Sequence, residues 1–188
     1  MIFNQTLVRR MITVALLTIL ACDRAQAPVA PHAMGGDAAA LHAGHIAIGP
    51  EFEQQLAALR ELTARFRDFE RAKAAGWSTP ITTCLDSPIG AMGVHYGNLA
   101  YIDGNVNVLE PELLMYEPEP DGRLRFVGVE YIVPLNAWTA STPPTLLGQE
   151  FQVNSAFGVW ALHVWLGREN PSGLFSNWNP KVSCASAP

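Results

Sequence analysis

The sequence predicts an α+β domain in which one N-terminal amphipathic helix packs on a mainly antiparallel β-sheet, flat or curled. Three observations favour this class. Apolar residues recur at helical spacing only near the start of the domain, over residues 50–75. Later segments are rich in Val, Trp, Tyr and Phe and are separated by turn residues, as strands are. Hydrophobic residues make up 49% and charged residues 15%, a balance that favours a buried core over disorder.

The helix over 50–75 has clear end signals. Pro50 suits the first helical position, and Gly76 suits the left-handed residue that follows a helix. One apolar stripe runs along it, formed by Phe52, Leu56, Leu59, Leu62, Phe66 and Phe69. We expect this stripe to pack on the sheet, and binding of a partner is the alternative.

Three strands are expected in the second half of the chain. Residues 113–117 and 124–133 flank a turn at 119–122, which predicts a β-hairpin. Residues 157–166 form a longer apolar run that ends before a second turn at 170–173. The period of this run also allows a buried helix, but its Val and Trp content favours a strand.

The N-terminus predicts an exported protein with a signal peptide over 1–21. Arg9 and Arg10 precede an apolar run over 11–20, which is too short to cross a membrane. Ala21 and Cys22 follow it and resemble the lipobox of bacterial lipoproteins, in which the cysteine is lipidated. The membrane is then a partner through the anchor at Cys22, on the periplasmic face of the envelope. Cleavage after the small residues of 25–27, and an uncleaved anchor, remain alternatives.

Residues 22–49 predict a flexible tether, rich in Ala, Pro, Gly and His, ahead of a single domain over 50–188. The tether contains four potential ligands for copper or zinc: His32, Met34, His42 and His45. Incidental histidines in a linker are the alternative interpretation.

The three cysteines support the lipoprotein prediction, because lipidation of Cys22 leaves an even pair. We expect Cys84 and Cys184 to form a disulfide in an oxidising compartment, closing a loop of ~100 residues. Two free buried thiols are the alternative, and the absence of a Cys-x-x-Cys spacing argues against a cysteine metal site.

The charge pattern argues against nucleic-acid binding. The net charge is −5, and no run of Lys and Arg is present. No phosphate-binding loop, nucleophile-elbow or haem-attachment motif occurs.

Three polar residues stand where apolar ones are expected. His95 lies between Gly93 and Gly97, and His163 lies in the run 157–166. Glu130 is in a strand that is apolar on both faces, and strict alternation places it with Leu124, Phe126, Gly128 and Ile132. A buried carboxylate is costly unless it is paired, protonated or bound to metal.

Two imidazoles and one carboxylate are a common set of ligands for zinc, iron(II), manganese or copper(II). The hypothesis is that His95, Glu130 and His163 bind one divalent transition metal. The alternatives are a hydrogen-bonded core histidine for His163 and an ion pair of Glu130 with Arg123, Arg125 or Arg168.

Five sequence blocks resemble a family of exported bacterial proteins described as hypothetical lipoproteins. The blocks are 92–96 (MGVHY), 128–131 (GVEY), 162–165 (LHVW), 170–173 (NPSG) and 178–184 (WNPKVSC). The likeness covers about residue 60 to Cys184 and implies one intact module without implying an activity. In that family a histidine often stands at the position of Gln152, which implies one potential ligand fewer here.

The predicted function is that of an envelope lipoprotein whose β-rich domain binds a metal ion or small molecule. A structural or interaction lipoprotein without such a site is the alternative from another class. A metal-dependent enzyme that uses the same three residues is the third candidate, and nothing in the sequence names its substrate or a protein partner.

Overall fold

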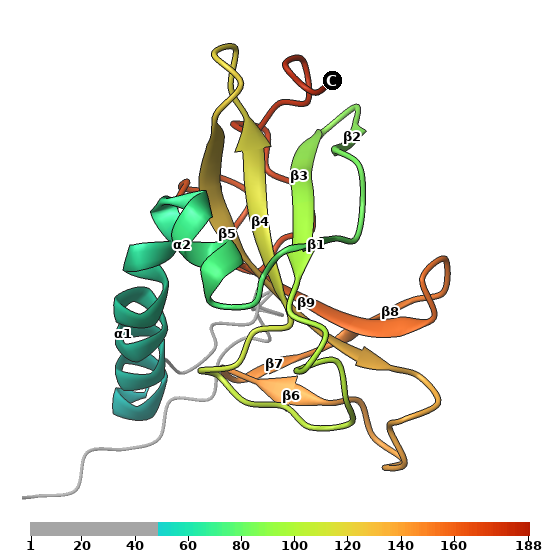
Figure 1. Cartoon of the computed structure of the whole chain (residues 1–188). Helices are drawn as coiled ribbons and strands as arrows, with labels where there is room; N and C mark the ends of the chain where they lie inside the picture. The colour runs from blue at the N-terminus through green and yellow to red at the C-terminus, as the bar shows by residue number, and fades with distance from the viewer. Residues whose placement is uncertain (1–48) are drawn as a thin grey trace, which may run out of the picture. The chain divides into compact units, whose positions relative to one another are not determined.

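The computed structural model describes residues 49–188, and Figure 1 shows a sheet with helices on one side of it. The predicted signal peptide, the predicted lipidation site Cys22 and the candidate ligands of the tether lie outside the described residues. Within residues 49–188, no helix has both the length and the apolar character needed to cross a membrane.

The α+β class is confirmed, with a mostly antiparallel sheet that does not close into a barrel. Its order is β1-β3-β4-β5-β9-β8, and β2 pairs with β3 beside β1. The strands are β1 (Thr79–Pro80), β2 (Leu85–Ser87), β3 (Gly90–Gly97), β4 (Leu113–Pro118), β5 (Leu124–Pro134), β8 (Gln152–Asn154) and β9 (Val159–Trp165). A separate two-stranded sheet joins β6 (Thr145–Leu146) and β7 (Gln149–Glu150).

The predicted helix over 50–75 is shorter than expected and divided. It forms α1 (Pro50–Ala64), a 3₁₀ turn (Arg65–Arg67) and α2 (Phe69–Ala74). Asp68 causes the division, because its backbone is extended and its carboxylate accepts a hydrogen bond from Glu70 N at 3.0 Å, which starts α2. Gly76 follows α2 with φ of +112°, as the stop signal predicts.

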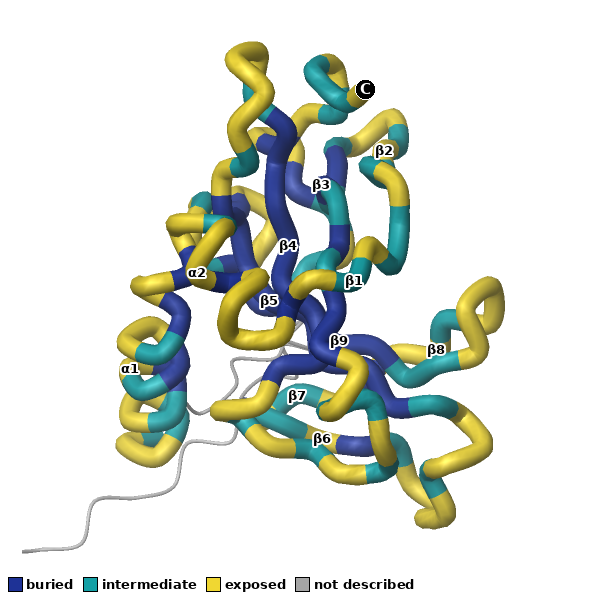
Figure 2. Tube along the Cα trace, in the orientation of Figure 1, coloured by how far each residue is buried: buried dark blue, intermediate teal, exposed yellow. Residues whose placement is uncertain are grey.

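The helices cover one face of the sheet with the apolar stripe that the sequence predicts. Leu56, Leu59 and Phe66 are buried there with the alternate residues of β4, β5 and β9. Figure 2 shows the buried stretches of these central strands, against the exposed outer side of α1. This packing fixes which residues of each strand face the helices and which face away.

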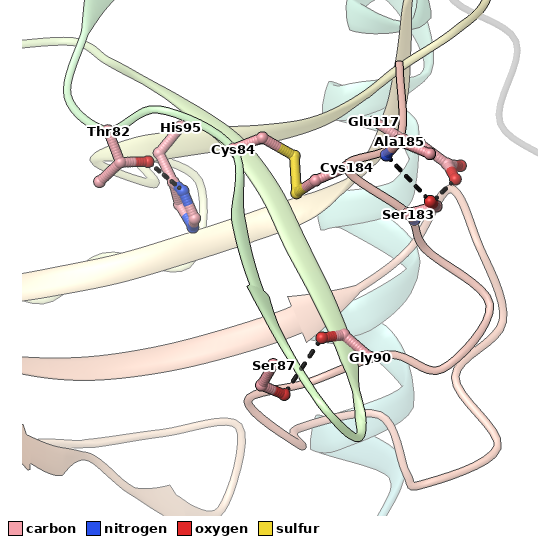
Figure 3. Close-up of a disulfide and its surroundings, with 9 residues drawn as sticks. All are labelled: Thr82, Cys84, Ser87, Gly90, His95, Glu117, Ser183, Cys184 and Ala185. Carbon is pink, nitrogen blue, oxygen red and sulfur yellow. Dashed lines mark hydrogen bonds between the residues drawn. A yellow bond between two sulfur atoms is a disulfide. The ribbon is translucent and has the colours of Figure 1, made fainter. Parts of the chain in front are cut away.

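A disulfide joins Cys84 and Cys184, as predicted, with their Cα atoms 5.7 Å apart (Figure 3). It connects the segment between β1 and β2 to the C-terminal segment. Ser183 N, next to Cys184, donates to the carboxylate of Glu117 in β4 at 3.0 Å. The end of the chain is therefore held on the sheet by a covalent bond and by a buried carboxylate.

Candidate metal site

The three polar residues that the sequence singled out come from three strands of one sheet. His95 is in β3, Glu130 in β5 and His163 in β9. Glu130 and His163 are direct partners in the ladder, and β4 separates Glu130 from His95. Directly paired residues of antiparallel strands point to the same face, so all three side chains project from the face that lies away from the helices.

The position of Glu130 in its strand corrects one expectation. Leu124 and Phe126 pack with the helix-side core and not on the face of Glu130. The register shifts between Met115 and Tyr116, which pair with Gly128 and Phe126, so Val127 is inserted as a β-bulge. Because a bulge reverses the alternation, the period of two holds only from Gly128 onward.

The side chains converge. One ligand atom from each of His95, Glu130 and His163 lies within 4.8 Å of the other two. Glu130 Oε2 is 3.3 Å from His95 Nε2, and Glu130 Oε1 is 3.5 Å from His163 Nε2. Two ligands bound about 2.1 Å from one ion at the tetrahedral angle are themselves about 3.4 Å apart. This buried group could therefore hold a metal ion.

Three of the four imidazole nitrogens of this group have no hydrogen-bond partner among the described residues. Within residues 49–188, the buried side-chain atoms without one are His95 Nε2, both ring nitrogens of His163, and Glu117 Oε2. Glu130 is close enough to both rings for an ion pair, but neither contact is aligned as a hydrogen bond. Buried polar atoms are normally paired, so these nitrogens are free to bind a metal ion or a hydrogen-bonding group.

Thr82 orients the ring of His95. Its hydroxyl lies 2.8 Å from His95 Nδ1, as Figure 3 shows. When Nδ1–H donates to this hydroxyl, Nε2 carries the lone pair on the side of Glu130, as in metal-bound histidines. Thr82 is in a loop, and no pattern in the sequence connected it with His95.

Burial keeps His95 neutral. The ring is 1% exposed, and its burial lowers the pKa of His95 to about 4, although the charge of Glu130 opposes this shift. His163 lowers the pKa further. The neutral imidazole is the form that binds metals, so the ring is in its ligating state at neutral pH.

The arginines that the sequence offered as partners of Glu130 pair elsewhere. Arg168 contacts Glu117 at 3.3 Å. Arg123 and Arg125 contact carboxylates near the 119–122 turn. Glu130 is 7% exposed and has only the two imidazoles as close charged or chargeable partners among the described residues. The ion-pair alternative with arginine is therefore wrong.

Gln152 lies near the cluster without joining it. It pairs with Ala161 in β9, one alternate position before His163, and therefore faces the same side of the sheet. Its amide oxygen accepts a hydrogen bond from Asn177 at 3.3 Å. The group therefore has three candidate protein ligands, and the position of Gln152 adds none.

A pocket opens beside the cluster. It has a volume of about 150 Å³, and both His95 and Glu130 are among its lining residues. Tyr116, Tyr131 and Trp165 do not line it and are buried in the packed core.

Comparisons with protein-family models, with curated proteins and with solved structures found no match for this chain. The resemblance to exported lipoproteins thus stays a prediction, and the function has to be inferred from the geometry of the cluster.

Proposed function

We propose that this chain is an envelope lipoprotein whose β-rich domain binds one divalent transition metal through His95, Glu130 and His163. The observation that carries the proposal is the convergence of a buried carboxylate and two buried imidazoles, in which His95 Nε2 and both ring nitrogens of His163 lack hydrogen bonds. A shared cation satisfies all three groups at once, whereas leaving them unpaired in an apolar environment is costly.

The donor atoms narrow the choice of metal. Two nitrogens and one carboxylate suit zinc, iron(II), manganese and copper(II). Zinc is our first choice, because three protein ligands of these types with one open position are typical of its catalytic sites. Three protein ligands leave a fourth position for water or another molecule.

Elemental analysis tests the metal site. The full chain is purified, dialysed with each candidate metal and then washed free of unbound ions. We expect one metal per chain and a loss of at least tenfold in affinity for Glu130→Gln, which keeps the size of the side chain and removes its charge. Glu117→Gln is the matched control, because Glu117 is another buried carboxylate of the same sheet and pairs with Arg168.

A second control addresses the tether. The double variant His42→Ala and His45→Ala should retain the full metal content. Equal metal content in wild type and Glu130→Gln, or metal lost only from the tether variant, would contradict the proposal.

Export and anchoring rest on the N-terminal pattern and on the disulfide. The apolar run, the small residue before Cys22 and the pairing of the other two cysteines support a lipoprotein in an oxidising compartment. In a bacterial host, wild type should fractionate with membranes and Cys22→Ser should not. Mass spectrometry of the mature N-terminus should find an acylated Cys22. A chain that begins at Pro28 would support ordinary cleavage instead.

A further inference from the structure

The pocket beside the metal ligands is a small, mostly apolar chamber. His95 and Glu130 contribute to its lining, and the other side chains include Ile81, Leu113, Ile132 and Val159. Leu113 and Ile132 are almost fully buried, whereas Phe157 is 54% exposed and marks the outer rim. The chamber therefore leads from the surface to His95 and Glu130, two of the three proposed metal ligands.

Its size limits what can enter. A cavity of about 150 Å³ accepts a molecule about as large as benzene. The apolar walls favour a compact hydrocarbon body over a sugar or a nucleotide, whose hydroxyl or phosphate groups would lose water without new partners.

The net charge of the proposed metal centre indicates which chemical group of the ligand would bind it. A divalent ion bound by one carboxylate and two neutral imidazoles keeps a net charge of about +1. Glu130 is the only acidic residue, and no Lys or Arg is present, among the described residues that line the pocket. A single anionic group on the fourth position would neutralise this charge, and a second anionic group would find no partner.

The geometry points to a small monocarboxylate as the ligand, with its carboxylate on the metal and an apolar body of about one phenyl ring in the pocket. This inference rests on the proposed metal site. It predicts that tight binding requires both parts of the ligand, because the metal binds its carboxylate and the apolar walls of the pocket bind its hydrocarbon body.

The test uses the full chain loaded with zinc, and benzoate as the probe, in isothermal titration calorimetry. Benzoate should bind at least tenfold more tightly than acetate, which lacks the body, and than benzyl alcohol, which lacks the charge. Removal of zinc should lower the affinity for benzoate at least tenfold. 2-Naphthoate, whose body exceeds the pocket, should bind more weakly than benzoate.

Variants separate the pocket from the metal. Val159→Phe fills the pocket and should abolish benzoate binding while the zinc content stays at one per chain. Val153→Phe is the matched control: Val153 is 51% exposed on the neighbouring strand and does not line the pocket. Phe157→Ala opens the exposed rim and should weaken benzoate several-fold, which tests the pocket even if Val159→Phe fails to fold.

The outcomes distinguish the two proposals. Zinc bound with no benzoate binding, or benzoate binding unchanged in both Val159→Phe and Phe157→Ala, overturns the ligand assignment and leaves the metal site standing. A chain that binds no zinc or other candidate metal overturns both. Benzyl alcohol that binds as tightly as benzoate shows an apolar pocket only and overturns the carboxylate.

Discussion

The two faces of the sheet treat their polar groups in different ways. On the helix side, β4, β5 and β9 contribute to one large apolar core with α1 and α2. The polar tips within this core are bonded to backbone oxygens: Tyr116 donates to Phe66 O at 2.8 Å, Tyr131 to Val108 O at 2.7 Å and Trp77 to Pro111 O at 2.9 Å. These hydrogen bonds satisfy the polar ends of the buried aromatic residues and so contribute to the stability of this core.

The opposite face has no single apolar core, and we call it the divided face. Two small apolar clusters lie on it, one around Met115 and Trp165 and one around Leu113 and Ile132. His95, Glu130 and His163 converge on this face, and His95 Nε2 and both ring nitrogens of His163 have no hydrogen-bond partner among the described residues. Apolar residues in their places would pack more cheaply, so the cost of burying them indicates a role other than stability.

Loss of the disulfide should lower the stability more than any other change considered below. The disulfide belongs to the divided face, because Cys184 packs against the Met115 and Trp165 cluster. It closes a loop of 100 residues, for which the chain-entropy model gives about 4–5 kcal/mol. Urea unfolding with and without reductant should show a decrease of that order. Reductant should not affect the double variant Cys84→Ser and Cys184→Ser, and a loss below about 1 kcal/mol would show that packing alone holds the C-terminal segment.

A change on the helix side should affect stability without affecting the metal. Leu59 is fully buried there, so Leu59→Ala should lower the free energy of unfolding by about 4 kcal/mol. Leu62→Ala, at a partly buried position of the same helix, is the control and should cost less. Metal affinity of the folded protein should stay within about twofold of wild type. A loss of affinity that matches the loss of stability would mean that the two faces are not independent.

The helix side of the sheet also has a buried carboxyl, Glu112, whose contribution to stability should depend on pH. Glu112 lines a pocket with Gln55 of α1 and accepts a hydrogen bond from Ile132 N at 3.0 Å. Burial is the main reason that the pKa of Glu112 rises to about 8 from 4.5, and the charges of Asp103 and Glu130 add to it. Folded Glu112 thus keeps a proton that the unfolded chain releases above pH 4.5.

This difference in protonation sets how stability changes with pH. The contribution of Glu112 to stability is complete below pH 4.5 and is lost as the pH rises to about 8. At about 1.4 kcal/mol for each pKa unit, the loss reaches about 3 kcal/mol by pH 7. Glu112→Gln should therefore be more stable than wild type by about that amount at pH 7 and nearly equal at pH 4.5. A constant difference across this range in urea titrations would contradict the shifted pKa.

Local patterns in the sequence were sufficient for much of the fold. The stripe from Phe52 to Phe66 predicted the face of the helix, and the turn at 119–122 predicted the hairpin of β4 and β5. The same patterns missed the break at Asp68, because the apolar spacing continues through it to Phe69. They also missed the bulge at Val127, because alternation alone contains no information on the register of the neighbouring strand.

The sequence was sufficient to predict the three candidate ligands of the site, but not the residues that surround them. A charge or an imidazole in an apolar strand is visible locally, which is why His95, Glu130 and His163 stood out. Thr82 and Phe157 come from loops, and what they contact depends on how the chain returns to the sheet. Long-range placement of this kind is set by tertiary packing and leaves no period in the sequence.

Stabilisation of the fold by bound zinc should be the smallest of these effects, and it tests the proposed metal site on the divided face most directly. A ligand that binds only the folded state raises the free energy of unfolding by about 2.7 kcal/mol when its free concentration is a hundred times its Kd. Zinc should therefore stabilise the wild-type chain in urea titrations, and a chelator should reverse the gain. Leu59→Ala and Glu117→Gln should show the same gain from lower starting points, because their metal ligands are intact. Glu130→Gln, whose affinity for zinc should fall at least tenfold, should gain no more than about 1.4 kcal/mol at that zinc concentration. If Glu130→Gln gained as much as wild type, zinc would be binding elsewhere, and the three residues would be no more than costly members of the core.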